Sequence, residues 1–539
     1  MNAAAEKKAE KKPEPRNLIR LWICVVIGVA LWFSPTPQGL SDPAWHIFAV
    51  FAATIVSFLL RPLPMGVCVL IGLLVIAASG ELSPLWVSQD FYPESSGELT
   101  TQPIEAEDRV KVASKKSLSG SGDTTTWRVV QTEAKDRVKI AFKKSLSGFG
   151  DTTTWLVVAA FLLAGAVVRT GLGRRLALTL ISKLGGSTLG LGYGVAAAEL
   201  LLGPFVPSNT ARGGGIMAPI VNSLAKALEA EPGRATRYLV LLGAHANLVT
   251  AAMFLTGMAA NPLVSKAAAD VLGVEFGWGR WLLGSIVPGL VSLGLLPLLM
   301  KWLLRPAVAG TAAKSQARDE LTAMGPWTAK QVALATVLVG MLALWSTGPL
   351  QKLALGYALP TALVAIAGVV LLVVLGVEKW SDVTGNAAAW DTLIWLGGLI
   401  TMAGALRDTG FTKWLGDNAG ELVSGWPAIG AAVALAAMYF YSMYAFSMLT
   451  GHILALGGVV FAVGVAAGAP PLILVPLVAY FSNLCGCLTN YSSGPIVIYF
   501  GLGYVSIGRW FAVGFIVSLL HMAVWLGVGL AWWKLLGWW

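Results

Sequence analysis

The sequence predicts an all-α polytopic membrane protein with about 11 transmembrane helices. Of its 539 residues, 56% are hydrophobic and only 12% are charged, whereas soluble proteins carry about 25% charged residues. A membrane-spanning helix needs about 20 mainly apolar residues, so a chain of this length has room for roughly ten to twelve. Glycine (61 residues) and proline (26 residues) are frequent, as in membrane helices that are broken or closely packed. The lack of charge excludes a water-soluble enzyme and a disordered protein.

The basic residues lie in short clusters between the apolar runs, at 7–20, 174–175 and 301–330. Lys and Arg of membrane proteins concentrate in cytoplasmic loops, so the placement of these clusters indicates how the chain is oriented in a lipid bilayer. The formal net charge of +10 is therefore not interpreted as a sign of a nucleic-acid partner. The first cluster places the N-terminus in the cytoplasm. No small-residue cleavage site follows the first apolar run, which is therefore interpreted as a retained span. The four cysteines lack the spacing of a redox or zinc pair, so neither a metal nor another cofactor is expected.

Residues 1–16 are polar and are predicted to be disordered. The apolar runs fall at about 17–34, 44–61, 65–80, 153–186, 188–229, 236–266, 277–305, 328–350, 354–378, 390–425, 427–469, 470–500 and 508–537. Several exceed the length of one span, so each of these must contain two passes, a hairpin or a broken helix. Between them lie a polar stretch at 81–150 and a hydrophilic linker at 306–327.

The polar stretch contains a tandem duplication. Residues 106–130 match residues 134–158 at an offset of 28, with 20 of 25 positions identical. The second copy runs on into an apolar segment, whereas the first runs into further charged residues. We therefore expect the second copy to be the working one and the first to be an insert. Two copies do not indicate a solenoid, which needs three or more units.

A weaker similarity relates the two halves of the chain. Three patterns recur in the same order at offsets between 233 and 240: 151–156 as 391–396, 164–171 as 403–410, and 256–262 as 489–495. Two similar membrane halves with Gly- or Pro-interrupted segments at corresponding positions indicate the binding site of a secondary transporter. Compositional bias is the alternative explanation.

The first of four polar interruptions lies at 204–212, within an apolar run. Two prolines break the helix, Ser208, Asn209 and Thr210 restart it, and Arg212 follows. A half-helix N-terminus at membrane depth offers free N–H groups and about half a positive charge to an anion. The three polar residues could merely cap the helix. A cap alone does not explain a break inside the membrane, where unpaired backbone must line a cavity.

The other interruptions lie at 256–262, 448–452 and 489–495. They supply the further candidate binding residues Thr256, Asn261, Thr450, His452, Thr489, Asn490, Ser492 and Ser493. At an offset of 240, residues 448–450 fall where 208–210 fall in the first half, and only the threonine is the same. His452 is one of four histidines. An ionisable group inside the membrane is a functional candidate by default, and a hydrogen-bonded interhelical histidine is the alternative.

These motifs resemble the divalent anion:sodium symporter family, and most closely its branch of bacterial citrate/succinate antiporters and plastid 2-oxoglutarate/malate translocators. The most specific parts are Pro-Ser-Asn-Thr-Ala-Arg at 207–212, Thr-Gly-His at 450–452 and Leu-Thr-Asn-Tyr-Ser-Ser-Gly-Pro at 488–495. The resemblance runs from Ala44 to the C-terminus, apart from the insert near 81–134.

The resemblance implies an inverted-repeat secondary transporter, a homodimer in a bacterial inner membrane with an elevator-like movement. It implies re-entrant hairpins at about 151–187 and 390–425, with the carboxylate between the two Ser-Asn-Thr-type breaks. The expected organisation is a cytoplasmic N-terminus (1–16), scaffold helices (17–80), the polar stretch (81–150), a first transport repeat (151–305), the linker (306–327), and second scaffold helices with a transport repeat (328–539).

The charge of the substrate bears on the coupling mode. Two half-helix N-termini of about +0.5 each compensate about one of the two negative charges of a dianion, so about one negative charge is left uncompensated. Leu449 stands where sodium-coupled members of the family have the Asn of a sodium site. We therefore expect His452 or Arg212 to supply the missing charge, and one di- or tricarboxylate (2-oxoglutarate, malate, succinate or citrate) to be exchanged for another. Sodium-coupled symport is the main alternative. A passive channel would need a continuous polar pore, and an enzyme is disfavoured because paired catalytic groups are missing.

Overall fold

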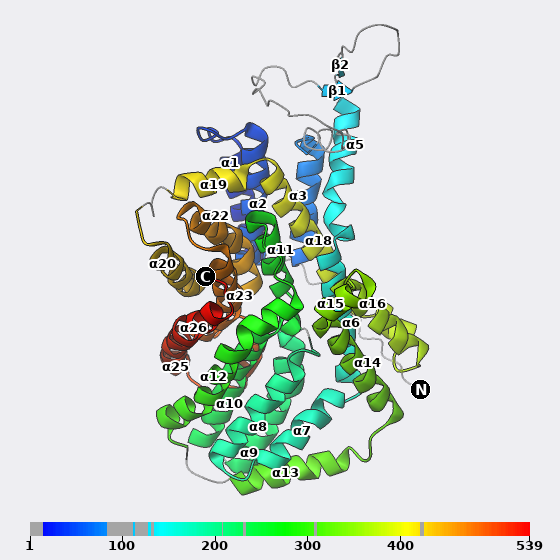
Figure 1. The fold of residues 1–539 in the computed structure, drawn as a ribbon, viewed down its shortest axis with the longest axis vertical. Coiled ribbons are helices and arrows are strands. Elements are labelled where there is room, and N and C mark those ends of the chain that lie inside the picture. The colour runs from blue at the N-terminus through cyan, green and yellow to red at the C-terminus, as the bar shows by residue number, and fades with distance from the viewer. Residues whose placement is uncertain are drawn as a thin grey trace. The chain divides into compact units, whose positions relative to one another are not determined.

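The computed structural model describes residues 15–82, 111–113, 128–130, 134–206, 208–229, 233–306, 310–420 and 425–539. In these ranges, nine helices are long and apolar enough to cross a membrane, and four shorter apolar helices accompany them. The helices follow the apolar runs of the sequence, and each run that is too long for one span is divided (Figure 1). The all-α polytopic membrane class is confirmed. The predicted disorder of 1–16 falls almost wholly outside the described residues.

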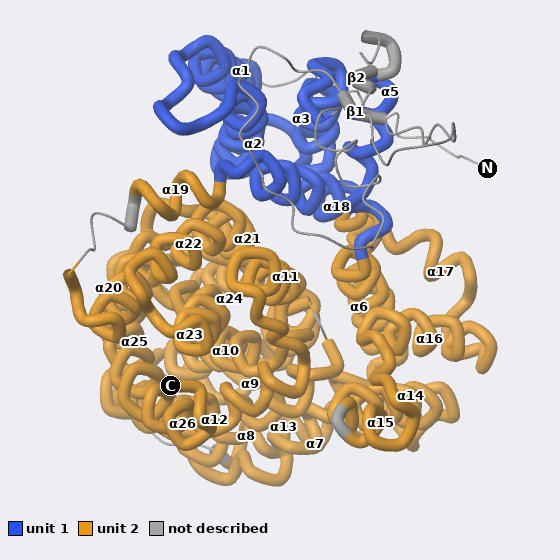
Figure 2. Tube along the Cα trace, turned by 45° about the horizontal axis from the view of Figure 1, so that its top comes forward, with its two compact units in different colours: residues 1–151, 394–411 blue, residues 152–393, 412–539 orange. Residues whose placement is uncertain are grey.

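The chain divides into two compact units, coloured separately in Figure 2. Unit 1 comprises residues 1–151 and 394–411, and unit 2 comprises residues 152–393 and 412–539. The elements of unit 1 are α1 (Pro15–Trp32), α2 (Asp42–Leu60), α3 (Met65–Ser79), β1 (Lys111–Ala113), β2 (Arg128–Val130), α5 (Ala134–Ser145), η1 (Ser147–Gly150) and most of α18 (Ala387–Asp408).

Unit 1 is held together by close backbone approach to α18. A Cβ atom on Gly398 would lie 2.2 Å from Val69 of α3, and one on Gly148 would lie 1.9 Å from the carbonyl oxygen of Gly397. Gly148 N–H also donates to Thr401 Oγ1 at 2.9 Å. Small residues therefore let α3 and the end of α5–η1 pack directly on α18, as is usual between membrane helices.

The two copies of the duplication differ in structure. In the first copy, β1 and β2 pair antiparallel, with Lys111 opposite Val130. The matching residues of the second copy, 139–141 and 156–158, lie in α5 and in α6 (Thr152–Arg169). Nearly identical short segments thus form strand in one place and helix in the other, because their environment outweighs a weak local preference. Residues 106–110 and 114–127 of the first copy lie outside the described residues.

The first half of unit 2 surrounds a buried central helix. Its elements are α6, α7 (Leu172–Leu184), α8 (Thr188–Leu202), η2 (Thr210–Met217), α9 (Ala218–Leu228), α10 (Arg234–Met253), η3 (Leu255–Gly257), α11 (Asn261–Leu272) and α12 (Trp278–Leu304). Helix α10 is buried along nearly its whole length. It packs against α8, α9, α12 and α23 (Pro471–Leu484). Polar residues of α10 must therefore find partners inside the protein.

The connection between the halves is helical. It comprises α13 (Gly310–Ala323), α14 (Ala329–Ser346), α15 (Gly348–Leu355), α16 (Thr361–Val374) and α17 (Trp380–Thr384). The hydrophilic linker forms α13, whose Glu320 pairs with Arg174 at 2.8 Å and accepts hydrogen bonds from Ser223 and Gln316. A capping box of Thr328 and Gln331 begins α14, which satisfies its first free N–H groups.

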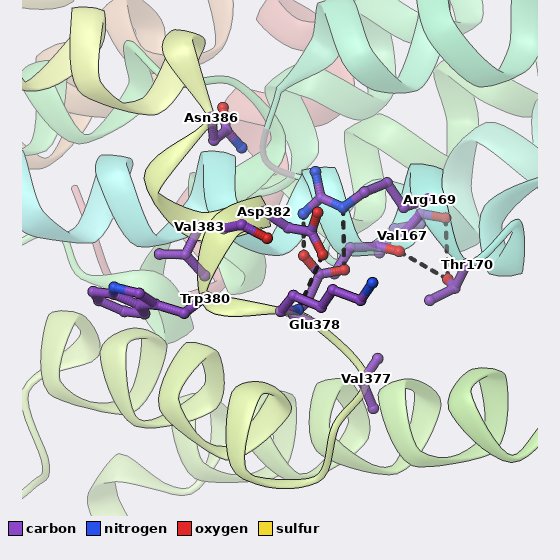
Figure 3. A network of polar contacts seen from close by, with 12 residues as sticks. Val167, Arg169, Thr170, Val377, Glu378, Trp380, Asp382, Val383 and Asn386 are labelled. Atoms are coloured by element: carbon purple, nitrogen blue, oxygen red, sulfur yellow. Dashed lines mark hydrogen bonds and ion pairs between the residues drawn. The ribbon is translucent and has the colours of Figure 1, made fainter.

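A second polar network fastens this connection to α6 (Figure 3). Arg169, in the last turn of α6, forms an ion pair with Glu378, and Arg169 Nε donates to Glu378 Oε1 at 3.2 Å. Asn386 Nδ2 donates to the carbonyl oxygen of Phe161 at 3.2 Å. Asp382 accepts a hydrogen bond from the backbone N–H of Lys379 at 3.0 Å and so caps α17.

The second half repeats the element order of the first. It comprises α19 (Phe411–Gly420), α20 (Ala428–Tyr441), η5 (Ser442–Ala445), α21 (Leu449–His452), η6 (Ile453–Gly457), α22 (Gly458–Ala466), α23, η7 (Cys485–Leu488), α24 (Gly494–Gly501), α25 (Ile507–Met522), η8 (Ala523–Gly529) and α26 (Leu530–Leu535). Two of the polar interruptions, at 204–212 and 448–452, are called here the first and the second polar break. A π-helical segment follows each of them, η2 after the first and η6 after the second.

The segments expected to be hairpins, 151–187 and 390–425, each form two helices joined by a short turn. Gly171 and Gly410 occupy these turns with φ of 70° and 81°, a conformation that favours glycine. The polar breaks belong to two other helix pairs, which span 188–228 and 428–466. The glycine turns and the polar breaks are thus separate features of each half.

Candidate functional site

The first polar break separates α8 from η2. Helix α8 ends at Leu202, and Ser208 Oγ accepts a hydrogen bond from Ala211 N–H at 3.2 Å, so Ser208 caps the helix that restarts. From Thr210 to Met217 that helix is π-helical. Such segments widen the helix and occur often at functional sites. Pro207 lies outside the described residues.

Arg212 is fully buried, and its donors bind the protein itself. Its Nε donates to Glu199 Oε2 at 2.8 Å, and Nη1 donates to the carbonyl oxygens of Val206 at 2.9 Å and Gly257 at 3.0 Å. A buried charge needs a partner and satisfied hydrogen bonds, and Arg212 has both. It joins the break to η3.

Two side chains of α10 complete this network. Asn247 Nδ2 donates to Glu199 Oε2 at 3.0 Å, while Arg212 Nη2 donates to Thr250 Oγ1 at 3.2 Å and to the Asn247 carbonyl oxygen at 3.3 Å. Glu199 is also fully buried. Because the two charges neutralise each other inside the protein, the expected role of Arg212 as the cation that faces a substrate is not supported by its geometry.

The second polar break separates α20 from α21. His452 is fully buried, and its Nε2 lies 2.9 Å from the carbonyl oxygen of Tyr439 and 2.9 Å from Ser442 Oγ. Its ring packs on Tyr439 with 4.2 Å between centroids and meets Phe446 edge-on. A carbonyl oxygen can only accept, so Nε2–H donates to it. This geometry favours the interhelical histidine over a histidine that contacts substrate.

The two breaks meet around the segment 489–495. Leu449 N–H, in the first turn after the second break, donates to the carbonyl oxygen of Ser492 at 2.9 Å. On the other side, a Cβ atom on Gly494 would lie 2.3 Å from Thr210 Oγ1. The absence of a side chain at Gly494 therefore lets this segment reach the first break. The sequence predicted these segments separately, and unit 2 brings them together.

Asn261 joins the two halves at a second place. Its Nδ2 donates to the carbonyl oxygens of Ala251 and Phe254, each at 2.9 Å, and its Oδ1 accepts from Asn483 Nδ2 at 2.8 Å. Both side chains are fully buried. The side-chain amide of Asn261 thus forms its hydrogen bonds within the protein and stabilises the turn between α10 and α11.

Two other predicted residues have structural partners as well. Thr256 donates to the carbonyl oxygen of Pro204 at 3.1 Å and accepts from Trp278 Nε1 at 3.3 Å. Ser492 Oγ donates to the carbonyl oxygen of Gly486 at 2.6 Å. These bonds satisfy backbone carbonyls that the helix breaks leave open.

Six of the predicted residues have side chains without a hydrogen bond in the described part of the chain: Asn209, Thr210, Thr450, Thr489, Asn490 and Ser493. Thr489 Oγ1 and Ser493 Oγ are buried and unpartnered within those residues. Thr210 is exposed, and Thr450 and Asn490 are half-buried. Buried polar groups are nearly always satisfied, so these hydroxyl and amide groups are the candidates for contact with a ligand. All six are uncharged.

Sequence analysis missed Glu199, Asn247 and Asn483. Glu199 is a lone carboxylate within an apolar run, and that alone marks a residue for attention in a membrane helix. Asn247 and Asn483 occupy corresponding places in α10 and α23, at an offset of 236. The internal repeat, which relates the two positions, is the sequence signal that marks both residues.

The chain is similar to known membrane transporters along nearly its whole length. The family model described as "Sodium:sulfate symporter transmembrane region" matches residues 15–539. YflS of Bacillus subtilis (strain 168) is 36% identical over 99% of this chain and 100% of the relative. Dicarboxylate transporter 1, chloroplastic, of Spinacia oleracea is 34% identical over 96% and 81% of the two chains. The L-tartrate/succinate antiporter of Escherichia coli (strain K12) is 33% identical over 92% and 94%.

Two solved structures share the fold. MtrF of Neisseria gonorrhoeae matches with a TM-score of 0.53 and 12% identity over 94% of this chain and 96% of that one. The YdaH transporter of Alcanivorax borkumensis matches with a TM-score of 0.53 and 16% identity over 80% and 94%. The match of the family model over residues 15–539 and the relatives at 33–36% identity show that the chain belongs to the sodium:sulfate, or divalent anion:sodium, symporter family: it is a multi-pass membrane transporter and not an enzyme.

Proposed function

We propose that this transporter exchanges one di- or tricarboxylate for another across the membrane. The observation that carries the proposal is the meeting of the two polar breaks at 489–495, through Leu449 and Ser492 on one side and Thr210 and Gly494 on the other. Helix N-termini and free hydroxyl and amide groups suit a carboxylate. The spinach relative is named a dicarboxylate transporter and the Escherichia coli relative an antiporter of tartrate and succinate.

We propose that Asn209, Thr210, Thr450, Thr489, Asn490 and Ser493 bind the substrate. Candidate substrates are 2-oxoglutarate, malate, succinate and citrate. Thr210 begins the helix that continues to Leu228, and Leu449 begins the one that continues to Ala466. Each start carries about half a positive charge. Arg212, Thr256, Asn261, Ser208 and Ser492 then position the site without facing the substrate, because their side chains bind the protein. His452 binds the protein through Nε2, whereas its Nδ1 has no hydrogen-bond partner among the described residues.

Sodium-coupled symport is the second candidate, and one observation favours it. Arg212 is neutralised by Glu199, and His452 Nε2 binds the carbonyl oxygen of Tyr439. Neither is therefore placed to balance a dianion, of which about one negative charge remains after two helix N-termini. A co-bound cation would supply that charge. Against it stands Leu449, whose side chain offers no oxygen ligand to a hard cation.

The membrane arrangement is part of the proposal. The basic clusters support a cytoplasmic N-terminus, as the positive-inside pattern requires, and the bacterial relatives support an inner membrane. We propose a homodimer in which residues 17–80 belong to the scaffold, and residues 151–305 and the later part of 328–539 move like an elevator.

Uptake into liposomes preloaded with single carboxylates tests this function. We expect labelled succinate to enter only when a carboxylate is present inside, and equally fast in choline and sodium buffers. A saturable sodium requirement with uptake into empty liposomes would establish symport instead. Flux that does not saturate and is not accelerated by internal substrate would indicate a channel. Liposomes with the Asn209→Ala variant are the matched control.

A further inference from the structure

Unit 2 contains a polar cavity of about 500 Å³ where the start of α10, the end of α12 and the start of α25 meet. Arg234, Arg237, Arg305 and Arg509 line it. Asn247, which bonds Glu199 and Arg212 beside the first break, lies thirteen residues along α10 from Arg234, which corresponds to about 20 Å at 1.5 Å per residue. The cavity is therefore distinct from the meeting place of the two breaks.

The four arginines have no carboxylate among the residues that line the cavity. Within the described ranges, none of them forms an ion pair. Glu229, which precedes α10, is occupied: its Oε2 accepts from the N–H groups of Gly233 and Thr236, each at 2.9 Å. Arg234, Arg305 and Arg509 are exposed and Arg237 is half-buried, so all four can attract an anion that enters the cavity. The cavity thus has the charge of an anion site.

The rest of the lining is apolar. Arg509 lies in the first turn of α25, and Ala512, Val513 and Ile516 line the cavity three, four and seven residues later, on the same helix face. Leu303 and Leu304 add to this surface, and Trp302 beside them is 67% exposed. Exposed tryptophans gather at the membrane–water interface. A small polar anion would gain nothing from the apolar part, whereas an amphipathic anion would use both parts.

We propose that this cavity binds an anionic phospholipid, with the phosphate among the four arginines and an acyl chain along Ala512, Val513 and Ile516. Arg305 belongs to the basic cluster 301–330, which the positive-inside pattern assigns to the cytoplasmic side. Basic pockets between membrane helices on that side suit anionic headgroups. Arginine also matches phosphate with two parallel hydrogen bonds, unlike the more diffuse attraction of lysine. The lipid would fasten α10, α12 and α25 to one another.

Thermal unfolding of the full-length, delipidated protein in detergent tests this site. The probes are phosphatidylglycerol, phosphatidylcholine, inorganic phosphate and succinate, added separately. We expect phosphatidylglycerol to raise Tm by about 3–6 °C and the other three to leave it nearly unchanged. The Arg234→Gln/Arg509→Gln variant should lose most of this shift and retain one phosphatidylglycerol fewer per chain in native mass spectrometry.

The matched control is Lys183→Gln/Lys226→Gln, which removes two exposed cations from the last turns of α7 and α9. It should keep the full shift. An equal shift with phosphatidylcholine, or an unchanged shift in the arginine variant, would overturn the proposal. A full shift with inorganic phosphate alone would show a simple anion site, and a shift with succinate would show a second carboxylate site. If the Gln variant does not fold, Arg234→Lys/Arg509→Lys should fold and show a reduced shift.

Discussion

The two polar breaks occupy corresponding places and are braced by different chemistry. At an offset of 240, Arg212 corresponds to His452 and Glu199 to Tyr439. In the first half, Arg212 forms a buried ion pair with the Glu199 side chain at 2.8 Å. In the second half, His452 donates to the backbone carbonyl oxygen of Tyr439 at 2.9 Å. In both, a residue just after the break holds the helix that precedes it.

The difference shows that the repeat keeps the position of this contact and not its charge. The proposed carboxylate site therefore receives no cation from Arg212 or His452, because Arg212 is neutralised by Glu199 and His452 donates to a neighbouring helix. Removing the Arg212–Glu199 ion pair should lower the free energy of unfolding more than removing the hydrogen bond from His452 to Tyr439. An unpaired buried charge is far less stable than a buried carbonyl oxygen that has lost a donor.

Glu199→Ala should have the largest effect. It leaves Arg212 buried without its counter-charge, so we expect the free energy of unfolding to fall by about 3–5 kcal/mol and transport to be lost. Chemical denaturation of the purified protein measures the first quantity. Glu378→Ala is the control, because Arg169 in that ion pair is 38% exposed and water can replace the lost partner. Equal losses in the two variants would contradict the prediction.

The double variant Glu199→Leu/Arg212→Met sharpens the same point. Replacing both charges by apolar side chains should restore most of the stability. Transport should stay low, since the carbonyl oxygens of Val206 and Gly257 lose the donor that positions the break. Recovery of transport together with stability would show that Arg212 only fills space.

Asn209→Ala and Thr210→Ala should affect transport and not folding. A hydrogen bond to a charged group is worth about 1.5–3 kcal/mol, so uptake at low substrate concentration should fall about 10- to 100-fold. Thr256→Ala is the contrasting variant, because the Thr256 hydroxyl holds Pro204 and its loss should lower Tm as well. Uptake near the wild-type rate in both Asn209 and Thr210 variants would rule out this part of the site.

His452→Ala should lower the free energy of unfolding by about 1–3 kcal/mol. The carbonyl oxygen of Tyr439 loses one of its two side-chain donors and keeps the other, Ser442 Oγ. His452→Gln retains an N–H donor and should recover part of this loss. Transport per folded molecule should be nearly unchanged in the Gln variant between pH 6 and 8. If the Gln variant folds normally and yet has lost most of its uptake, His452 contacts the substrate after all.

Leu449→Asn would make the second break resemble the first. Leu449 is 2% exposed, so the buried amide should cost about 1 kcal/mol of stability. We expect the variant to take up succinate faster in sodium than in choline, since the amide supplies an oxygen ligand. Wild-type protein in the same buffers is the control. Sodium-independent uptake by a folded variant would show that Leu449 does not set the coupling mode.

Glu320 and Arg174, outside the membrane, provide the smallest effect. Partial burial raises the pKa of Glu320, but hydrogen bonds from Ser223, Arg174 and Gln316 outweigh it and hold the pKa below its ordinary value. The stability that ionised Glu320 adds to the folded protein is therefore fully present above about pH 4.3, the pKa of an unperturbed Glu. It is lost as the pH falls through the lower pKa that Glu320 has in the folded protein. We expect this pair to add less than about 1 kcal/mol to the free energy of unfolding, because Arg174 is 55% exposed and water screens the attraction. Glu320→Gln should unfold with a weaker dependence on pH between 3 and 7; identical pH dependence would refute this.

Much of the fold was determined by the sequence alone. In a membrane every backbone polar group must be paired within the segment, so apolar runs of sufficient length have to be helices. Runs too long for one span had to be divided, and the prolines and small polar residues at 204–212 marked where. The repeat between the halves likewise located the second break at 448–452, and the family followed from these motifs.

Only the tertiary structure decided which polar side chains remain available to a ligand. Arg212, Thr256 and Asn261 are residues of the types that a carboxylate-binding site would need. Their polar side-chain atoms nevertheless form hydrogen bonds with the protein itself. Their partners come from distant parts of the chain: Asn261 and Asn483 are 222 residues apart. The same holds for the duplication, whose copies form strand and helix from nearly one sequence. Spacing along the chain specifies which residues share a helix face, whereas the pairing of buried donors and acceptors depends on how helices pack, and that is set by all segments together.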